Sequence, residues 1–591
     1  MTVRNSGSEP IEGVQLSMSL TREPLTSTDA VAAFLEDPTG VDAREVALTP
    51  EEEPAEEDAT TDSTEDAEEA PVGETLAAGG AKVMSISADD EALDLPADAW
   101  GVYGISLALE TPEGSVEVGA AVTTWVDSEV PNLDVAVLAV ADGTAEDVAA
   151  TLDATALDGV AVATDPTALT NALVFDNDLL EREVVRLPSG DPDLTSLAHG
   201  DGASILDLAV TEPSGSSILS TGKMPLIAPV QVLDDETLAL AQDAGAIAAL
   251  ASRDTVGVED LGSSLTLAEG SDLPIVSPDP VLSEIVAGGA TNPAVDGALV
   301  AASALTEGGA ALVTLDADGA VTPAGARLVE TLLGSPWVTP VSMADLAASA
   351  ADLDTSVDLP GTRDTENDLP ADDVATLTSR LSSLTTLASV TDNPAAAVQE
   401  WGAGLVAGVR AAGRNAQALR ESSLATALEG AEATLMGVAI AEGSDLNLLA
   451  DSGDIPITVV NSLDKDVTVT VRLVSNSPNL VVEDSPEITV RGGQEATALV
   501  PVSAVSTANV TVVVGLETAE GDQACPVADL RHPRARGLGH RRRRDLHRLA
   551  GAPDGRGRHS HHSSRPHRHS PWPIAHSGGA AHRRRRPHRG G

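Results

Sequence analysis

The alternation of apolar runs with capped helices from about residue 131 onward constrains the fold more than any other feature. Leu133 to Val140 is a largely apolar run, as a strand buried on both faces requires. The unit recurs where Leu226 to Leu233 precedes a helix capped by Asp234. Strands joined by crossover helices in this way predict an α/β domain over residues 131–350, with either a parallel sheet or a barrel-like one.

Two further segments follow this domain. Residues 369–435 are rich in Ala, Leu, Arg and Glu at helical spacing, which predicts a helical segment. Alternating apolar and polar residues then predict an immunoglobulin-like β-sandwich over residues 436–520. Its expected strands are Ile455 to Asn461, Val467 to Val474, Glu487 to Val490, Ala496 to Val502 and Val510 to Leu516.

Residues 1–128 show the same period of two and predict a first β-sandwich. Its opening Thr2-Val-Arg-Asn-Ser6 resembles Thr458-Val-Val-Asn-Ser462 in the second sandwich. Expected strands are Val3 to Asn5, Val14 to Leu20, Lys82 to Ile86, Val102 to Leu109 and Val116 to Trp125.

An acidic stretch interrupts the first sandwich. Residues 51–70 carry 11 acids and no base, so burial cannot offset the ordering entropy, and we expect a disordered loop over residues 41–75. The fold class is therefore multidomain α+β, in which an α/β domain and a helical segment lie between two immunoglobulin-like sandwiches.

Charge divides the chain into two parts. The whole has a net charge of −58, yet residues 523–591 hold 17 of the 34 basic residues and 11 of the 12 histidines. The acidic remainder argues against nucleic acid and anionic membranes as ligands for most of the chain. Two interpretations of the basic tail stand: a disordered nucleic-acid arm with a metal-binding tract at His559, His561 and His562, or the product of a frameshift.

We favour the frameshift. Reading the tail one base later converts Arg-Arg codon pairs into Val, Ala, Gly or Asp, so arginine runs become apolar runs. Permitted codons turn Leu530 to Leu538 into an alternating strand, and residues from Gly539 onward into an apolar helix followed by arginines. That pattern is typical of a membrane anchor with a cytoplasmic end. We expect the intact protein outside the cell, tethered by its C-terminus, whereas this chain as given shows neither a signal peptide nor a membrane helix.

Few residues are candidates for chemistry. Asp191, Asp193 and His199 could form a metal site or an acid and base set like those of carbohydrate hydrolases and deacetylases. A deacetylase-type site needs a second histidine, and His199 is the only one before residue 523. We favour the alternative that Gly190-Asp-Pro-Asp193 is a turn that caps the next helix, and we expect no catalytic residue among the three.

Other acidic pairs and the single cysteine give weaker signals. Asp176 and Asp178 are expected in an exposed acidic loop, and Asp316-Ala-Asp318 starts like a calcium loop but lacks its later ligands. Cys525 stands alone, which excludes a disulfide framework and a thiolate metal site. Neither a nucleophile elbow nor a phosphate-binding loop occurs, so we expect no cofactor and no metal ion.

The tryptophans permit two interpretations. Trp100, Trp125, Trp337 and Trp401 could stack on sugar rings. The chain has only 5 Trp, 1 Tyr and 2 Phe, and large rings that are so scarce are expected to anchor the core instead.

Several short motifs together resemble a known family. They are the opening Val-Arg-Asn-Ser, Gly190-Asp-Pro-Asp-Leu194 followed by Leu197-Ala-His199, Ser335-Pro-Trp337 before Pro340-Val341, and the Val-Val-Asn-Ser of the second sandwich. The chain resembles the actinobacterial domain-of-unknown-function family 6049 over most of residues 1–520. The resemblance implies a large secreted protein with a signal peptide and a C-terminal membrane helix, encoded beside the peptidoglycan-precursor flippase. It implies no catalytic residues.

Together these observations predict an extracytoplasmic cell-envelope protein. We expect a binding or scaffold component linked to cell-wall synthesis, with an envelope protein or a cell-wall glycan as its partner. The alternative is a carbohydrate-active enzyme, a glycan hydrolase or deacetylase, that acts on cell-wall glycans through the α/β domain.

Overall fold

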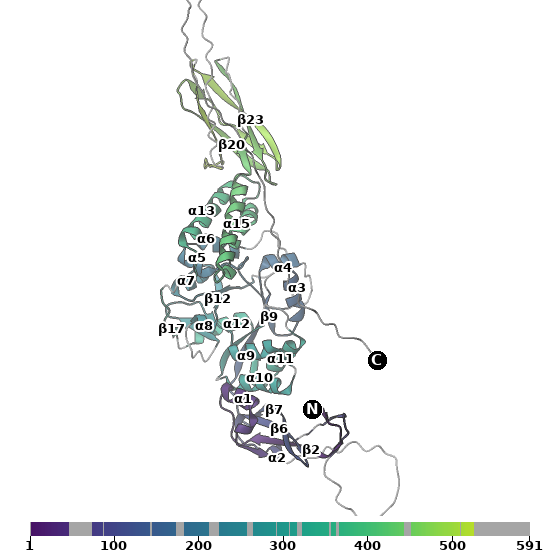
Figure 1. Cartoon of the computed structure of the whole chain (residues 1–591). Coiled ribbons are helices and arrows are strands. Elements are labelled where there is room, and N and C mark those ends of the chain that lie inside the picture. The colour runs from purple at the N-terminus through teal and green to yellow at the C-terminus, as the bar shows by residue number, and fades with distance from the viewer. Residues whose placement is uncertain are drawn as a thin grey trace, which may run out of the picture. The chain divides into compact units, whose positions relative to one another are not determined.

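The computed structural model describes residues 2–524 of the chain, apart from internal gaps (Figure 1). The gaps are residues 47–73, 85, 87, 142–144, 173–181, 212–223, 257–263, 291, 307, 316–321, 354–355, 362–365, 442–450, 507 and 509. Most of the predicted acidic loop and nearly all of the basic tail therefore lie outside the described residues. The chain divides into two units, Met1–Arg534 and Ala535–Gly591, and the structural description below concerns the first. No helix within the described part has the length and apolarity needed to cross a membrane.

The N-terminal part contains two antiparallel sheets. β1 (Thr2–Arg4) pairs with β5 (Ala81–Val83), and the larger sheet has the order β3-β2-β6-β7, with β4 also paired to β2. The other bounds are β2 Ile11–Thr21, β3 Ala43–Glu45, β4 Glu74–Leu76, β6 Trp100–Thr111 and β7 Gly114–Val126. Strands form at all five positions where the sequence predicts them, although β5 ends at Val83 rather than at Ile86.

The N-terminal part also contains a helix that the sequence analysis missed. α1 (Thr28–Glu36) begins after Ser27, whose side chain accepts a hydrogen bond from the amide of Ala30. Its Phe34 ring is buried against β6, where a Cβ on Gly104 would lie about 2.5 Å from ring carbons. Gly104 is therefore required by the close approach of the ring.

The two Val-x-Asn-Ser motifs form the same local structure. The buried Asn5 donates to the carbonyls of Glu9 (2.8 Å) and Leu76 (3.1 Å) and accepts from the amide of Gly7. The buried Asn461 likewise donates to the carbonyl four residues on (2.8 Å) and to a distant one (3.0 Å), and accepts from the amide two residues on. The similarity seen in the sequence is thus also a similarity of hydrogen bonding.

The central part is an α/β structure built on a ten-stranded, mainly parallel sheet. The strand order is β15-β8-β9-β10-β11-β12-β14-β13-β17, with β16 also paired to β8. Its strands are β8 Leu133–Ala141, β9 Val160–Thr164, β10 Val184–Arg186, β11 Leu226–Pro229, β12 Ala246–Leu250, β13 Leu265–Ala268, β14 Ile275–Val276, β15 Gly309–Leu315, β16 Val338–Pro340 and β17 Ser356–Val357. Its helices are α3 Ala145–Ala154, α4 Pro166–Ala172, α5 Leu194–His199, α6 Ala203–Val210, α7 Asp235–Asp243, α8 Arg253–Val256, α9 Pro280–Gly288, α10 Pro293–Leu305, α11 Pro323–Leu333 and α12 Met343–Ala348.

The sheet curls until its two sides meet. The segment after β14 forms a backbone hydrogen bond to β15: the amide of Asp279 donates to the carbonyl of Leu312 at 2.7 Å. On the inside, Met343 and Leu346 of α12 pack among strand residues such as Leu138 and Ile227. The sequence left open whether the sheet is open or barrel-like, and the structure gives a curled, barrel-like sheet.

Two strands of this sheet are shorter than the sequence predicts. The run from Leu226 to Leu233 gives a strand only as far as Pro229, and the residues after it lead into α7, whose N-cap is Asp234. The apolar run in the sequence likewise predicts a strand over Leu273 to Ser277, of which β14 covers only Ile275–Val276. Leu233 and Leu273 lie beyond the two strands and are nevertheless buried by tertiary packing. Periodicity alone cannot separate such a buried connection from a strand.

The helical segment forms as predicted. It consists of α13 (Ala371–Ala388), α14 (Pro394–Ala407) and α15 (Gln417–Leu435). α14 lies directly on α6, since a Cβ on Gly402 would come within 2.6 Å of the Leu208 side chain.

The C-terminal part consists of two antiparallel sheets. One has the order β18-β19-β23-β21 and the other β22-β20-β24. The strands are β18 Val438–Ile440, β19 Ser452–Asn461, β20 Val467–Ser475, β21 Leu480–Val482, β22 Glu487–Val490, β23 Gln494–Ala504 and β24 Val512–Glu517. All five strands expected from the sequence are present, and β18 and β21 are additions.

Candidate functional site

The turn predicted at Gly190 to Asp193 joins the α/β part to the helical segment. Gly190 and Asp191 both have positive φ, at 81° and 50°, which fits a tight turn. The amide of Asp193 donates to the carbonyl of Val409 (2.7 Å), and the amide of Ala411 donates to the carbonyl of Asp191 (2.8 Å). The turn is thus fixed to the connection between α14 and α15.

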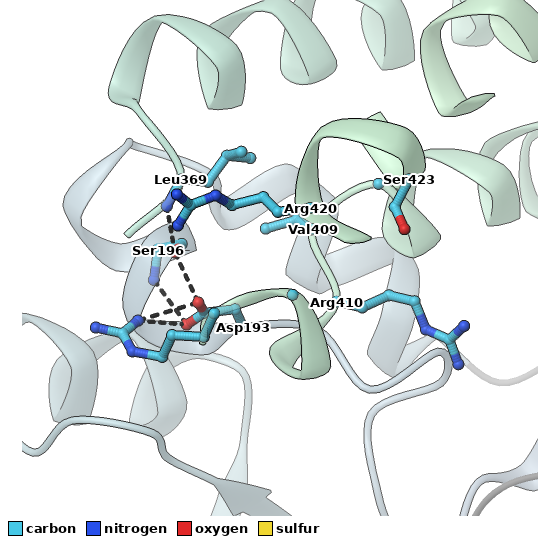
Figure 2. Close-up of a pocket in the computed structure, with 10 residues that line it drawn as sticks. Asp193, Ser196, Leu369, Val409, Arg410, Arg420 and Ser423 are labelled. Atoms are coloured by element: carbon cyan, nitrogen blue, oxygen red, sulfur yellow. Dashed lines mark hydrogen bonds and ion pairs between the residues drawn. The ribbon is translucent and has the colours of Figure 1, made fainter. Parts of the chain in front are cut away.

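Asp193 has the capping role that the sequence suggests. It is the N-cap of α5, where its Oδ1 accepts from the amide of Ser196 (3.1 Å) and its Oδ2 from the Ser196 hydroxyl (2.8 Å). The Nη1 of Arg414 donates to both carboxylate oxygens at 3.0 Å. Figure 2 shows Asp193 and Ser196 in this arrangement. One carboxylate therefore caps the N-terminus of a helix and binds an arginine from a distant segment.

His199 lies between two other carboxylates. Its Nδ1 is 2.6 Å from Oδ2 of Asp368, and its Nε2 is 2.9 Å from Oδ2 of Asp234. Asp368 also accepts from Nη2 of Arg414 at 2.5 Å, which links the histidine to Asp193. These five residues, Asp193, His199, Asp234, Asp368 and Arg414, are called the charged cluster below.

The surroundings favour a protonated His199. Burial lowers the pKa of His199, but the hydrogen bonds to Asp368 and Asp234 together raise it by more, so the pKa lies above its ordinary value. Both ring nitrogens face carboxylate oxygens, and only the imidazolium can donate to both. With three aspartates, one arginine and one imidazolium, the charged cluster has a formal charge of −1.

The charged cluster is closed to a substrate. The side chains of Asp193, Asp234, Asp368 and Arg414 are between 0% and 8% exposed, and that of His199 is 9% exposed. The cavity beside Asp193, shown in Figure 2, has a volume of only about 10 Å³, which is about the space of one water molecule. Over the part of the chain that the structure describes, no group of three His, Cys, Asp or Glu side chains is arranged to hold a metal ion.

The three candidate residues Asp191, Asp193 and His199 therefore have different roles in the structure. Asp193 and His199 belong to the same network, with Asp368 and Arg414 between them, and Asp191 contributes its backbone carbonyl to the turn. A protonated His199 has no lone pair with which to act as a base or a metal ligand. The arrangement joins the α/β part to the helical segment through hydrogen bonds between buried charged groups.

The other acidic candidates lie outside the described residues. Asp176 and Asp178 fall in the gap at 173–181, and Asp316 and Asp318 fall in the gap at 316–321. Cys525 and the histidine tract also lie in the undescribed tail.

The four tryptophans do not share one role. The indole nitrogen of Trp337 is buried and donates to the Ser303 hydroxyl (3.3 Å), and that of Trp125 donates to the carbonyl of Pro96 (2.9 Å). Trp100 packs against a hydrophobic core. Trp401 is only partly buried and lines a groove between α14 and α15.

The sequence analysis did not find Asp368 and Arg414, and it saw Asp234 only as a helix cap. Asp368 and Arg414 lie 169 and 221 positions from their partners His199 and Asp193. The sequence showed Asp234 as a helix cap, but its complete burial, unusual for an aspartate, is visible only in the structure.

Comparison with known protein families finds a match for this chain. A model described as a family of unknown function (DUF6049) matches residues 132–529, more than half of the chain. The chain belongs to the DUF6049 family. The match covers the α/β part, the helical segment and the C-terminal sheets, and every residue of the charged cluster lies within it. The DUF6049 description assigns no activity, and no curated protein matches the chain.

Proposed function

We propose that the chain is a non-catalytic component of the cell envelope, which binds or scaffolds partners of cell-wall synthesis outside the membrane. The observation that carries this proposal is the closed charged cluster. The best candidates for an acid, a base and an electrophile are all used to join two parts of the fold. What the described surface offers instead is sheet edges and a groove, which bind without a reactive centre.

The two β-rich parts support a binding role. We propose that both act as immunoglobulin-like modules, and the matching hydrogen bonds of Asn5 and Asn461 support their relation. Edge strands such as β18 and β24 carry backbone groups on one side that a partner strand can pair with.

We further propose that the intact protein is anchored by a C-terminal membrane helix. The support is the abrupt change to a basic, histidine-rich composition after residue 523, together with the apolar run that the shifted reading frame permits. The family match ends at residue 529, close to this change. Sequencing the coding DNA tests the idea: an early stop codon in the shifted frame would refute it.

The binding role is tested by crosslinking in cells. The frame-restored protein should capture an envelope protein, and its deletion should change the wall composition. Capture should weaken with rising salt if the partner is basic, because the Debye length falls from about 10 Å at 0.1 M to about 3 Å at 1 M. Recovery of no envelope protein together with an unchanged wall would refute the role.

The curled parallel sheet favours an enzyme on cell-wall glycans as the second candidate, because such sheets carry catalytic groups at the carboxyl ends of their strands. At one such end, however, the Asp165 carboxylate is used by the turn, where it accepts from the Ser189 hydroxyl (2.8 Å) and the amide of Gly190 (3.0 Å). Release of sugar or acetate from wall material by the full chain, abolished in Asp165→Asn or His199→Gln, would establish the enzyme.

A further inference from the structure

A groove lies between α14 and α15 of the helical segment. It has a volume of about 460 Å³, within the range of small-ligand sites, about 300–1,000 Å³. Its lining includes Trp401 and Gly404 from α14, Arg410 from the connection, and Ser423, Thr426 and Gly430 from α15. We call it the α14/α15 groove.

Two glycines in this groove are not required by the fold. Gly404 and Gly430 lie inside helices, where glycine costs roughly 0.5–1 kcal/mol relative to alanine. A Cβ added at either position would meet no atom within 4 Å. By contrast, a Cβ on Gly402 would approach Leu208 to 2.6 Å, and one on Gly408 would approach Ala427 to 2.8 Å.

The glycines that packing requires differ from the two that face the groove. Packing accounts for Gly402 and Gly408, but nothing in the described structure occupies the space beside Gly404 and Gly430. A bound ligand that approaches the helix backbone closely would account for the second pair, since glycine allows such an approach.

The polar groups of the groove indicate what the ligand carries. Among the described residues, the guanidinium of Arg410 has neither an ion-pair nor a hydrogen-bond partner, and Figure 2 shows it extending away from Asp193. The one carboxylate in the lining, that of Glu400, is paired with Lys465 at 2.6 Å. An unpaired arginine beside a neutralised acid favours a ligand with a carboxylate, which a guanidinium binds through two hydrogen bonds.

The aromatic and hydroxyl groups favour a sugar. Trp401 has a large apolar face and an indole N–H with no partner in the described structure, and pyranose rings pack their C–H faces on such rings. The Ser423 hydroxyl, also without a partner there, is available to ring hydroxyls.

We propose that the α14/α15 groove binds an acidic amino-sugar chain, with Trp401 against a sugar ring, Arg410 on its carboxylate, and Gly404 and Gly430 leaving room for it. The choice of a wall glycan as the source of this ligand rests on the proposed envelope function. Binding itself depends only on the groove.

The test compares two disaccharides by titration calorimetry on the full chain. One is N-acetylglucosamine linked to N-acetylmuramic acid, which carries a carboxylate, and the other is N,N′-diacetylchitobiose, which does not. We expect the acidic sugar to bind about tenfold more tightly or better, because the neutral sugar leaves Arg410 unpaired. Absence of binding at millimolar concentration, or equal binding of both sugars, would overturn the proposal.

Substitutions locate the site. Gly430→Leu fills the groove and improves helix propensity, so it should abolish binding while the chain becomes no less stable. Arg410→Gln should remove the preference for the acidic sugar but keep weak binding of both. Ala403→Leu, on the exposed side of α14 away from the groove lining, is the matched control and should bind as the unchanged chain does.

The outcomes separate the groove from the function. Unchanged binding in Gly430→Leu would overturn the location. Failure of both sugars to bind, with an envelope protein still captured in cells, would overturn the groove and leave the proposed function standing. Binding of the acidic sugar, with no envelope protein captured in cells and no change in the wall, would overturn the proposed function and leave the groove standing.

Discussion

Replacement of Arg414 tests the interpretation of the charged cluster as a structural joint. Arg414→Met keeps the apolar stem and removes two hydrogen bonds to Asp193 and one to Asp368. The side chains of both aspartates are only 4% and 6% exposed, so their charges stay buried and the formal charge of the cluster changes from −1 to −2. Loss of one partner from a buried pair costs about 3–5 kcal/mol. We expect the free energy of opening the contact between the α/β part and the helical segment to fall by this amount.

The assay has to report locally, because a chain of several parts does not unfold in one step. Hydrogen exchange of peptides from α5 and α13 gives the free energy of opening at the joint. Arg380→Met is the matched control on the same helical segment. The Arg380–Glu432 pair is 3.3 Å long and its side chains are 41% and 43% exposed, so its loss should cost less than about 1 kcal/mol.

A partial rescue sharpens the test. Asp368→Asn in the Arg414→Met background removes one of the stranded charges, so the double variant should lose less than the sum of the two single variants. The reasoning is refuted if Arg414→Met opens α5 and α13 no more easily than Arg380→Met does, or if the two substitutions simply add.

Two further predictions concern single polar side chains. The pKa of His199 is raised above its ordinary 6.5 by folding, so its stabilising contribution is complete below that pH and is lost as pH rises through the folded value. The free energy of opening at α5, measured by hydrogen exchange, should therefore fall over this window more in the wild type than in His199→Gln, and parallel pH profiles would contradict this. Asn461→Ala leaves the carbonyls of Lys465 and Val490 without their donor and should cost about 1–3 kcal/mol, seen as faster hydrogen exchange in β20 and β22 but not in α14; unchanged exchange in these strands would show that the motif is not structural.

The sequence predicted the elements that have a periodic signal. Strand and helix alternation from Leu133 onward, the helical segment and five of the seven described C-terminal strands were predicted, because burial on one or two faces leaves a period in the sequence. α1 was missed although Ser27 offers a cap, because nine residues in a β-rich region give too short a pattern.

The site was less predictable for a physical reason. The capping role of Asp193 is local and could be seen in the Gly-Asp-Pro-Asp turn. The partners Asp368 and Arg414 are single polar residues in segments far along the chain, and only the folded chain brings them to Asp193 and His199. Their burial reverses the usual exposure of charged residues, so composition and spacing gave no sign of it.

The sequence distance within the charged cluster has a consequence during synthesis. Asp193 leaves the ribosome 221 residues before Arg414. At roughly 5–20 residues per second, that interval is on the order of 10–45 s. Throughout it the α5 cap must stay hydrated, or be held by another factor, because its permanent counter-charge has not yet been translated. A nascent chain stalled between these two points therefore has an incomplete joint, and the helical segment can be joined to the α/β part only after Arg414 has been synthesised.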